Sequence, residues 1–133
     1  MAVSGLGLVM YHLKDNKKEK QLMELCKQLG INTRKIKEND VNVSLSVLAG
    51  ISGVPVMAQS EKAPQSYVMP ELLVFSGLAE GKLDEFLAEY RKRGIEPVSL
   101  KAMITAHNIS WTVYQLVSEL AKERAAILMG RQQ

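Results

Sequence analysis

The residues best suited to contact a ligand follow an apolar run that ends at Thr105. The stretch SLKAMITAHNISW, residues 99–111, passes from apolar residues into His107 and Asn108 and then reaches Trp111, the only tryptophan of the chain. Threonine and asparagine side chains donate and accept hydrogen bonds, and histidine titrates near neutral pH. The stretch is therefore a candidate binding site at the end of a strand.

The same residues also have simpler roles in folding. Asn108 or Ser110 can be the N-cap of a following helix, and Trp111 can fill the gap between that helix and a sheet. His107 has no cysteine or acidic residue near it in sequence, so we do not expect it to be a metal ligand or a catalytic base. An enzyme that pairs His107 with a carboxylate such as Asp40, brought close by folding, is kept as an alternative.

Motifs that would identify an enzyme do not occur in the sequence. It has no G-x-x-x-x-G-K-[ST], H-E-x-x-H, G-x-S-x-G or C-x-x-C motif. Two distant histidines and Cys26, which lies on the apolar stripe of a predicted helix, do not form a clustered set of metal ligands. We therefore expect no catalytic residues, no metal and no cofactor, and a binding protein rather than an enzyme.

The first half of the chain predicts alternating strands and helices. Residues 6–13 form an apolar run short enough for a buried strand, and Leu22, Leu25, Cys26 and Leu29 have the spacing of one helix face that ends at Gly30. A weaker strand follows at 31–37. Residues 41–50 fit a strand or a short helix capped by Asp40 and closed by Gly50, and we favour the helix.

The second half repeats this order after a proline-containing loop at 51–66. Strands are predicted at 67–75 and 95–105, a helix before Gly94, and a long helix at 110–128. With an offset of 64 residues, Leu8 matches Leu72, Tyr11 matches Phe75, Lys18 matches Lys82, Gly30-Ile31 matches Gly94-Ile95, and Lys37 matches Lys101. The predicted fold is therefore α/β, with tandem β-α-β-α halves and a mainly parallel sheet covered by helices. We expect one domain over 1–133, with halves 1–50 and 67–130.

A parallel sheet would bring the loops after all four strands to one edge. Ligands bind beyond the carboxyl ends of such strands, so residues from all four loops are expected to converge there. The candidates for ligand binding are Ser76, Gly77, Thr105, His107, Asn108 and Trp111, with His12, Asp15 and Asp40 at the same edge.

Charge and composition limit the partners. The net charge is +3, and eight lysines and arginines lie between Lys14 and Lys37 against three acidic residues. Nucleic-acid binding through this segment is an alternative, which we rank below a solvated surface because no aromatic residues interleave with the cations to stack on bases. The single cysteine fits a reducing compartment, the cytoplasm, and no apolar run is long enough for a membrane span. The expected partner is a small molecule or a protein, and a homodimer is possible through an exposed sheet edge.

A pattern in the second half carries a family resemblance. An apolar strand ends in a Ser-Gly turn, a helix and a Gly-Ile step follow, and a Leu-Lys-Ala strand leads to Thr-x-x-Asn-x-x-Trp. In this arrangement, residues 71–123 resemble a bacterial family catalogued as a domain of unknown function, family 3783. The family often has proline between the threonine and the asparagine, where this chain has Ala106 and His107. The resemblance implies an α/β fold and no particular activity. The matching positions are Ser76, Gly77, Gly94, Ile95, Leu100, Lys101, Ala102, Thr105, Asn108 and Trp111.

Overall fold

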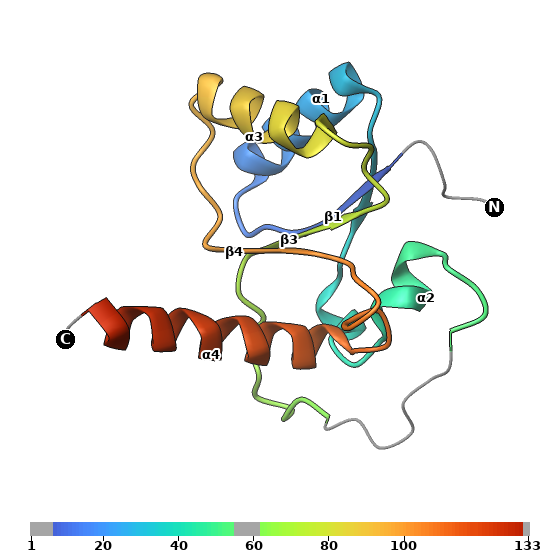
Figure 1. The fold of residues 1–133 in the computed structure, drawn as a ribbon, viewed down its shortest axis with the longest axis vertical. Coiled ribbons are helices and arrows are strands. Elements are labelled where there is room, and N and C mark those ends of the chain that lie inside the picture. Colours follow the sequence, from blue (N-terminus) through green and yellow to red (C-terminus); the bar gives the residue numbers. More distant parts are fainter. Residues whose placement is uncertain (1–6, 55–61, 132–133) are drawn as a thin grey trace.

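The computed structural model describes residues 7–54 and 62–131 of the chain. They form a four-stranded sheet with helices on both faces, which confirms the predicted α/β class (Figure 1). Residues 55–61 of the predicted loop lie outside the described residues. The strands are β1 (Leu8–His12), β2 (Asn32–Lys35), β3 (Leu72–Ser76) and β4 (Leu100–Met103), and their order in the sheet is β2-β1-β3-β4.

Two helices lie on each face of the sheet. In Figure 1, α1 (Asn16–Leu29) and α3 (Lys82–Lys92) lie side by side above the strands. Below the strands are α2 (Leu45–Ala49), a 3-10 turn η1 (Glu38–Asp40) and the long α4 (Val113–Arg131). No helix in these described ranges has both the length and the apolar character that crossing a bilayer requires.

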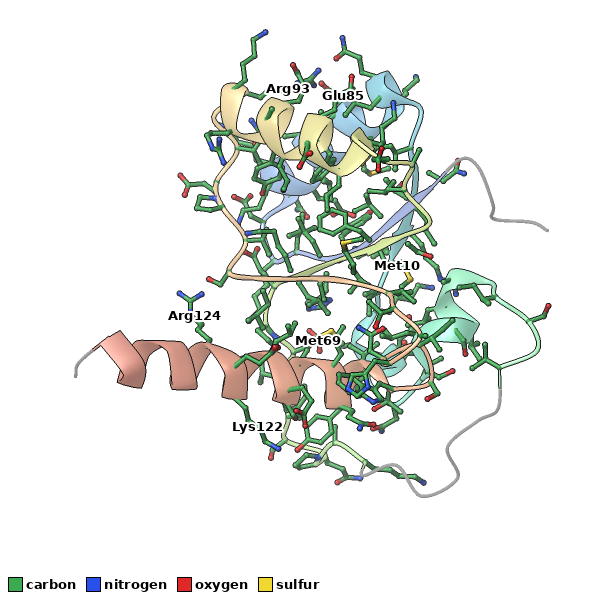
Figure 2. The ribbon with its side chains drawn as sticks, in the orientation of Figure 1. Met10, Met69, Glu85, Arg93, Lys122 and Arg124 are labelled. Atoms are coloured by element: carbon green, nitrogen blue, oxygen red, sulfur yellow. The ribbon has the colours of Figure 1, made fainter. Side chains whose placement is uncertain are left out.

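Each face of the sheet is covered by its own apolar core. Leu22, Cys26 and Phe86 of the upper helices pack on the odd-numbered residues of β1 and β3, and Cys26 is fully buried, as predicted. Met10, Met69 and Leu116 belong to the lower core between the sheet and α4, and Figure 2 shows Met69 on this side. The alternation follows from the strand geometry, because successive side chains point to opposite faces.

Local sequence signals explain where α1 begins and ends. The Asp15 side chain accepts a hydrogen bond from Lys17 N–H at 2.9 Å, which caps the first turn. Gly30 then adopts φ 73°, a left-handed conformation that glycine reaches without a steric penalty, and its N–H bonds back into the helix.

The central strand pairing differs from the prediction. β1 pairs with β2 in parallel and β3 pairs with β4 in parallel, but β1 and β3 run antiparallel. The sheet is mostly parallel, as predicted, yet its strands end at two opposite edges. The prediction that all four loops converge at one edge is therefore wrong. His12 ends β1, and it lies with Asp15 and Asp40 at one edge. Ser76 ends β3, and it lies with Thr105 at the other edge.

The antiparallel centre gives the two halves an approximate two-fold relation. Met10 pairs with Val74, which lies 64 positions later, and the register is symmetric around this pair: Leu8 faces Ser76, and His12 faces Leu72. The 64-residue offset found in the sequence therefore describes these two strands correctly. A two-fold axis through the Met10–Val74 pair exchanges the halves and keeps α1 and α3 on the same face.

The offset becomes 68 residues in the second pair of strands. Ile36 N–H donates to Tyr11 O at 2.7 Å, and Ile104 N–H donates to Phe75 O at 2.8 Å. Ile36 thus corresponds to Ile104, and the predicted match of Lys37 with Lys101 is wrong. The physical reason is an insertion, because four residues, 96–99, separate Ile95 from β4 whereas Ile31 directly precedes β2.

The two lower helices begin beside one another. Ser44 and Thr112 form an isolated antiparallel bridge, and each side chain caps its helix, by accepting from Val47 N–H and Gln115 N–H respectively. The predicted helix at 41–50 is confirmed as the shorter α2, which is closed by Gly50 but capped by Ser44 instead of Asp40. The prediction that Asn108 or Ser110 caps the last helix is wrong. Both residues lie in the turn before Thr112, which is the actual cap.

Candidate functional site

The turn after β4 is held together by Thr105 and Asn108. The buried Asn108 side chain accepts from Thr105 N–H through Oδ1 at 2.9 Å and donates from Nδ2 to Met103 O at 2.9 Å. Thr105 Oγ1 in turn accepts from the N–H groups of His107 and Asn108. These side chains therefore satisfy backbone groups that would otherwise be unpaired at the end of the strand.

His107 and Trp111 lie together beside this turn. The exposed His107 ring meets the Trp111 ring edge-on, with 5.1 Å between the ring centroids. Trp111 is half-buried against the lower core, and its carbonyl accepts from Leu45 N–H at 2.8 Å. The His107 ring thus keeps an exposed surface, whereas Trp111 also links the turn to α2.

Ser76 and Gly77 lie at the same edge of the sheet as Thr105. Because β3 and β4 are parallel, with Phe75 paired with Met103, their carboxyl ends meet there. Ser76 is buried opposite Leu8, and Gly77 is exposed with φ 66°. The structure thus brings Ser76 and Gly77 to the same edge as Thr105 and its turn, whereas Trp111 packs against the lower core at the start of α2. Contact of the six sequence-predicted residues with a ligand stays a prediction.

The first half contains the same turn. Lys37 N–H donates to Asp40 Oδ2 at 2.9 Å, and Asp40 lies 68 positions before Asn108. Leu45 N–H bonds to Trp111 O, and Val113 N–H bonds to Val43 O, so the two turns join through equivalent hydrogen bonds. The Thr-x-x-Asn-x-x-Trp pattern therefore has a structural role that the first half fulfils with other residues.

A groove with mainly apolar walls lies between α3 and β4 in the second half. A cavity of about 330 Å³ is followed by one of about 210 Å³, and Leu87 and Lys101 line both. No apolar or polar motif in the sequence predicted this groove. Its signal was the four-residue insertion before β4, which supplies part of the wall. The other lining residues are Leu73, Phe86, Tyr90, Arg91, Ile95, Pro97 and Val98 in the larger cavity and Phe75, Leu83, Ala102 and Met103 in the smaller one.

Two exposed cations lie along this groove. Lys101 Nζ donates to Val98 O at 2.7 Å, which holds the ammonium group against the wall of the larger cavity. Arg91 projects from the last turn of α3 into the same lining. The groove therefore combines apolar side chains with positive charge, which suits an apolar ligand that carries a negative group.

The phenol of Tyr90 is a hydrogen-bond donor in this groove. Its hydroxyl donates to Glu96 O at 2.5 Å, which fixes the inserted segment against α3. Burial, followed by the charges of Glu71 and Glu96, raises the pKa of Tyr90 to about 12. The phenol is therefore protonated at neutral pH and is poorly suited to accept a proton from a ligand.

A partly buried ion pair joins the two halves behind the groove. Lys18 Nζ of α1 lies 2.7 Å from Glu71 Oε1, and it also donates to Pro97 O at 3.4 Å. Burial of Glu71 opposes its ionisation. The hydrogen bonds from Lys18 and from Lys14 N–H, with the charges of both lysines, outweigh burial and lower the pKa of Glu71 below its ordinary value of 4.5.

The acidic, histidine and cysteine side chains of the described residues do not cluster. Within 7–54 and 62–131, no three His, Cys, Asp or Glu side chains are close enough to hold a metal ion. Burial raises the pKa of Cys26 to about 12, so its thiol is not activated. Over the same ranges, the Asp40 carboxylate bonds to Lys37 N–H, and no hydrogen bond joins it to His107.

The comparisons with known proteins agree with the resemblance found in the sequence. Residues 71–127 match the model of a family described as a domain of unknown function, DUF3783. This segment contains β3, α3, β4 and most of α4, and therefore both the groove and the turn after β4. No curated protein and no solved structure matches the chain.

Proposed function

We propose that this protein is a non-catalytic binding module whose ligand lies in the groove between α3 and β4. The observation that carries the proposal is the apolar cavity of about 330 Å³ with Arg91 and Lys101 along its lining. Small-molecule sites commonly begin at this size and combine apolar walls with a few placed polar groups. The ligand class is an apolar group with a carboxylate or a similar anion.

In this proposal, the site residues predicted from the sequence position the groove and do not form its main walls. Asn108 binds the carbonyl of Met103, a residue that lines the smaller cavity, so the turn positions one end of the groove. Direct contact of Ser76, Gly77, Thr105, His107, Asn108 or Trp111 with the ligand is the second candidate, and the exposed His107 ring is what favours it. In that case, replacing Thr105 and Asn108 by alanine weakens binding more than it lowers the melting temperature.

Other partners have less support. Two lysines of the basic segment that could bind nucleic acid already have acidic partners. Lys18 pairs with Glu71, and Lys35 Nζ lies 3.6 Å from Glu19 Oε2. A cytoplasmic location rests on the single cysteine, Cys26, which is buried and free.

The first test measures binding of simple apolar anions. Octanoate and 3-phenylpropanoate should raise the melting temperature, because a ligand that binds only the folded state stabilises it by mass action. Octanol should do so less, because it lacks the charge that Arg91 and Lys101 would contact. Calorimetry then gives the dissociation constants.

A matched pair of variants locates the site. Leu87→Trp fills the groove at a partly exposed position of α3, and Met23→Trp places the same side chain at the equivalent position of α1. We expect the first variant to abolish the binding of the acids and the second to leave it unchanged. Binding that both variants retain, or no binding of either acid to the natural chain, would contradict the proposed site.

A further inference from the structure

The two outer strands of the sheet, β2 and β4, occupy equivalent positions but carry different side chains. The sequence of β2 is Asn-Thr-Arg-Lys, and that of β4 is Leu-Lys-Ala-Met. Charged residues on an edge strand discourage pairing with another chain, whereas an apolar edge invites it. Met103 of β4 is 51% exposed, and its equivalent in β2 is Lys35. By this comparison, β2 is a protected edge and β4 is an open one.

The backbone of β4 offers hydrogen-bonding groups on its outer side. Ile104 N–H points inward to Phe75 O, so the alternation along a strand turns the N–H and C=O groups of Lys101 and Met103 outward. The C=O group of Met103 already accepts a hydrogen bond from Asn108 Nδ2. Among the residues that the structure describes, β4 is an outermost strand and pairs only with β3, so Lys101 N–H, Lys101 C=O and Met103 N–H have no neighbouring strand on their outer side.

Side chains beside this edge give it a chemical preference. Lys101 and Met103 lie on the α3 face, together with Leu83 and Leu87 along the smaller cavity. A strand that paired with β4 would place its alternate side chains next to Lys101 and Met103. The complementary side chains are an acidic one opposite Lys101 and apolar ones beside it.

We propose that the occupant is an extended acidic-apolar peptide segment of a partner protein, which adds to the outer edge of β4 as a fifth strand and places apolar side chains in the groove. This inference rests on the proposed function, since it uses the same groove and names the partner. Main-chain hydrogen bonds to Lys101 and Met103 supply affinity, and the groove supplies specificity.

Charge favours such a peptide over a second copy of the chain. An antiparallel pair of β4 strands that uses both outward groups of Lys101 sets this lysine directly opposite its own copy. Like charges in that position destabilise the pairing. A peptide with glutamate there forms an opposite-charge pair at the same place.

The test uses the peptide acetyl-Ser-Leu-Ser-Glu-Ser-Leu-Ser-amide and its versions with valine or phenylalanine in place of leucine. Leucine and glutamate occupy alternate positions, so they share one face of a strand. The peptide is expected to add antiparallel to β4 with its glutamate directly opposite Lys101, so that the two residues exchange their N–H···O=C bonds. N-methylation of the glutamate then removes the N–H that would reach Lys101 C=O. We expect this change to weaken binding at least tenfold, whereas N-methylation of a neighbouring serine, whose N–H points away, should change it less than twofold.

A charge exchange tests the partner's chemistry on the full chain. Lys101→Glu should weaken binding of the glutamate peptide at least tenfold, and the peptide with lysine instead of glutamate should restore it. Thr33→Glu makes the corresponding change in β2 and should leave both affinities unchanged. Met103→Lys, which gives β4 the side chain found in β2, should reduce peptide binding without affecting the melting temperature by more than a few degrees.

The outcomes separate this inference from the proposed function. Binding of octanoate without binding of any peptide overturns strand addition and leaves the groove as a small-molecule site. Peptide binding that tolerates N-methylation at glutamate also overturns strand addition. Dimers that form with concentration and disappear in Met103→Lys would replace the peptide by a second copy, and failure of both acids and peptides overturns both proposals.

Discussion

The two halves of the chain have one architecture and differ in what surrounds it. Each supplies two parallel strands, one upper helix and one lower helix, and the hydrogen bonds that join the two turns before α2 and α4 correspond residue by residue. The second half has the insertion at 96–99, the apolar groove and the more apolar of the two edge strands. In the first half, the equivalent hollow of about 580 Å³ contains Glu24, Lys27, Asn32 and Thr33. The groove and the edge strand on which the proposed binding rests therefore both belong to the second half.

The largest expected difference between the halves concerns the upper core. Phe86 and Leu22 are equivalent and fully buried, but Phe86 also packs edge-on against Phe75 and borders the groove. Phe86→Ala should lower the free energy of unfolding by about 3–5 kcal/mol, and Leu22→Ala by about 2–5 kcal/mol, with the greater loss at Phe86 because the removed ring is larger. Urea denaturation of both variants measures this. A greater loss of unfolding free energy in Leu22→Ala than in Phe86→Ala would contradict this expectation.

The next effect concerns the two turns. Asn108 is buried and makes two hydrogen bonds to the backbone, whereas Asp40 is partly exposed and makes one. Asn108→Ala should therefore cost about 1–3 kcal/mol, and Asp40→Ala about 0.5–1.5 kcal/mol. Asn108→Asp gives the second turn the side chain of the first and should lose the bond to Met103 O while keeping the one from Thr105. Equal costs at the two positions would mean that the bond to Met103 contributes no stability.

The smallest effect is a dependence of stability on pH. The pKa of Glu71 is lower in the folded state than its ordinary value of 4.5, so its ion pair with Lys18 stabilises the protein at higher pH. This contribution is lost as the pH falls through the folded-state pKa. Glu71→Gln should therefore reduce the loss of unfolding free energy between about pH 6 and about pH 3. The control is Glu85→Gln, because Glu85 is exposed and pairs with Lys82, the equivalent of Lys18, within one helix. An equal reduction in both variants would contradict a special role of Glu71.

The helices and strands could be predicted because their signals are local. Apolar spacing identified α1, Gly30 and Gly50 identified two helix ends, and the repeat favoured a helix in 41–50 over a strand. The direction of the central pairing could not be predicted from such signals. It depends on how β1 meets β3 across the whole chain, and a strand buried on both faces has the same apolar composition in either direction.

The candidate site could be predicted only where it follows a strand end. The sequence located Ser76 and Thr105 at one edge, but it could not show that Asn108 would turn inward to Met103. The groove depends on the packing of residues 95–98 against α3. The only trace of this packing in the sequence is the insertion that changes the offset between the halves from 64 to 68 residues. Lys101 was assigned to the wrong equivalent for the same reason, since an insertion does not affect the apolar pattern on either side of it.

The central strand pair also has a consequence for the order of folding. Leu8 pairs with Asn32, and Leu72 with Leu100, over short stretches of chain, whereas Met10 and Val74 are 64 positions apart. Closing the longer loop costs more entropy before any contact compensates for it. Each half should therefore assemble first, and the collision of the two preformed halves along β1 and β3 should limit the refolding rate.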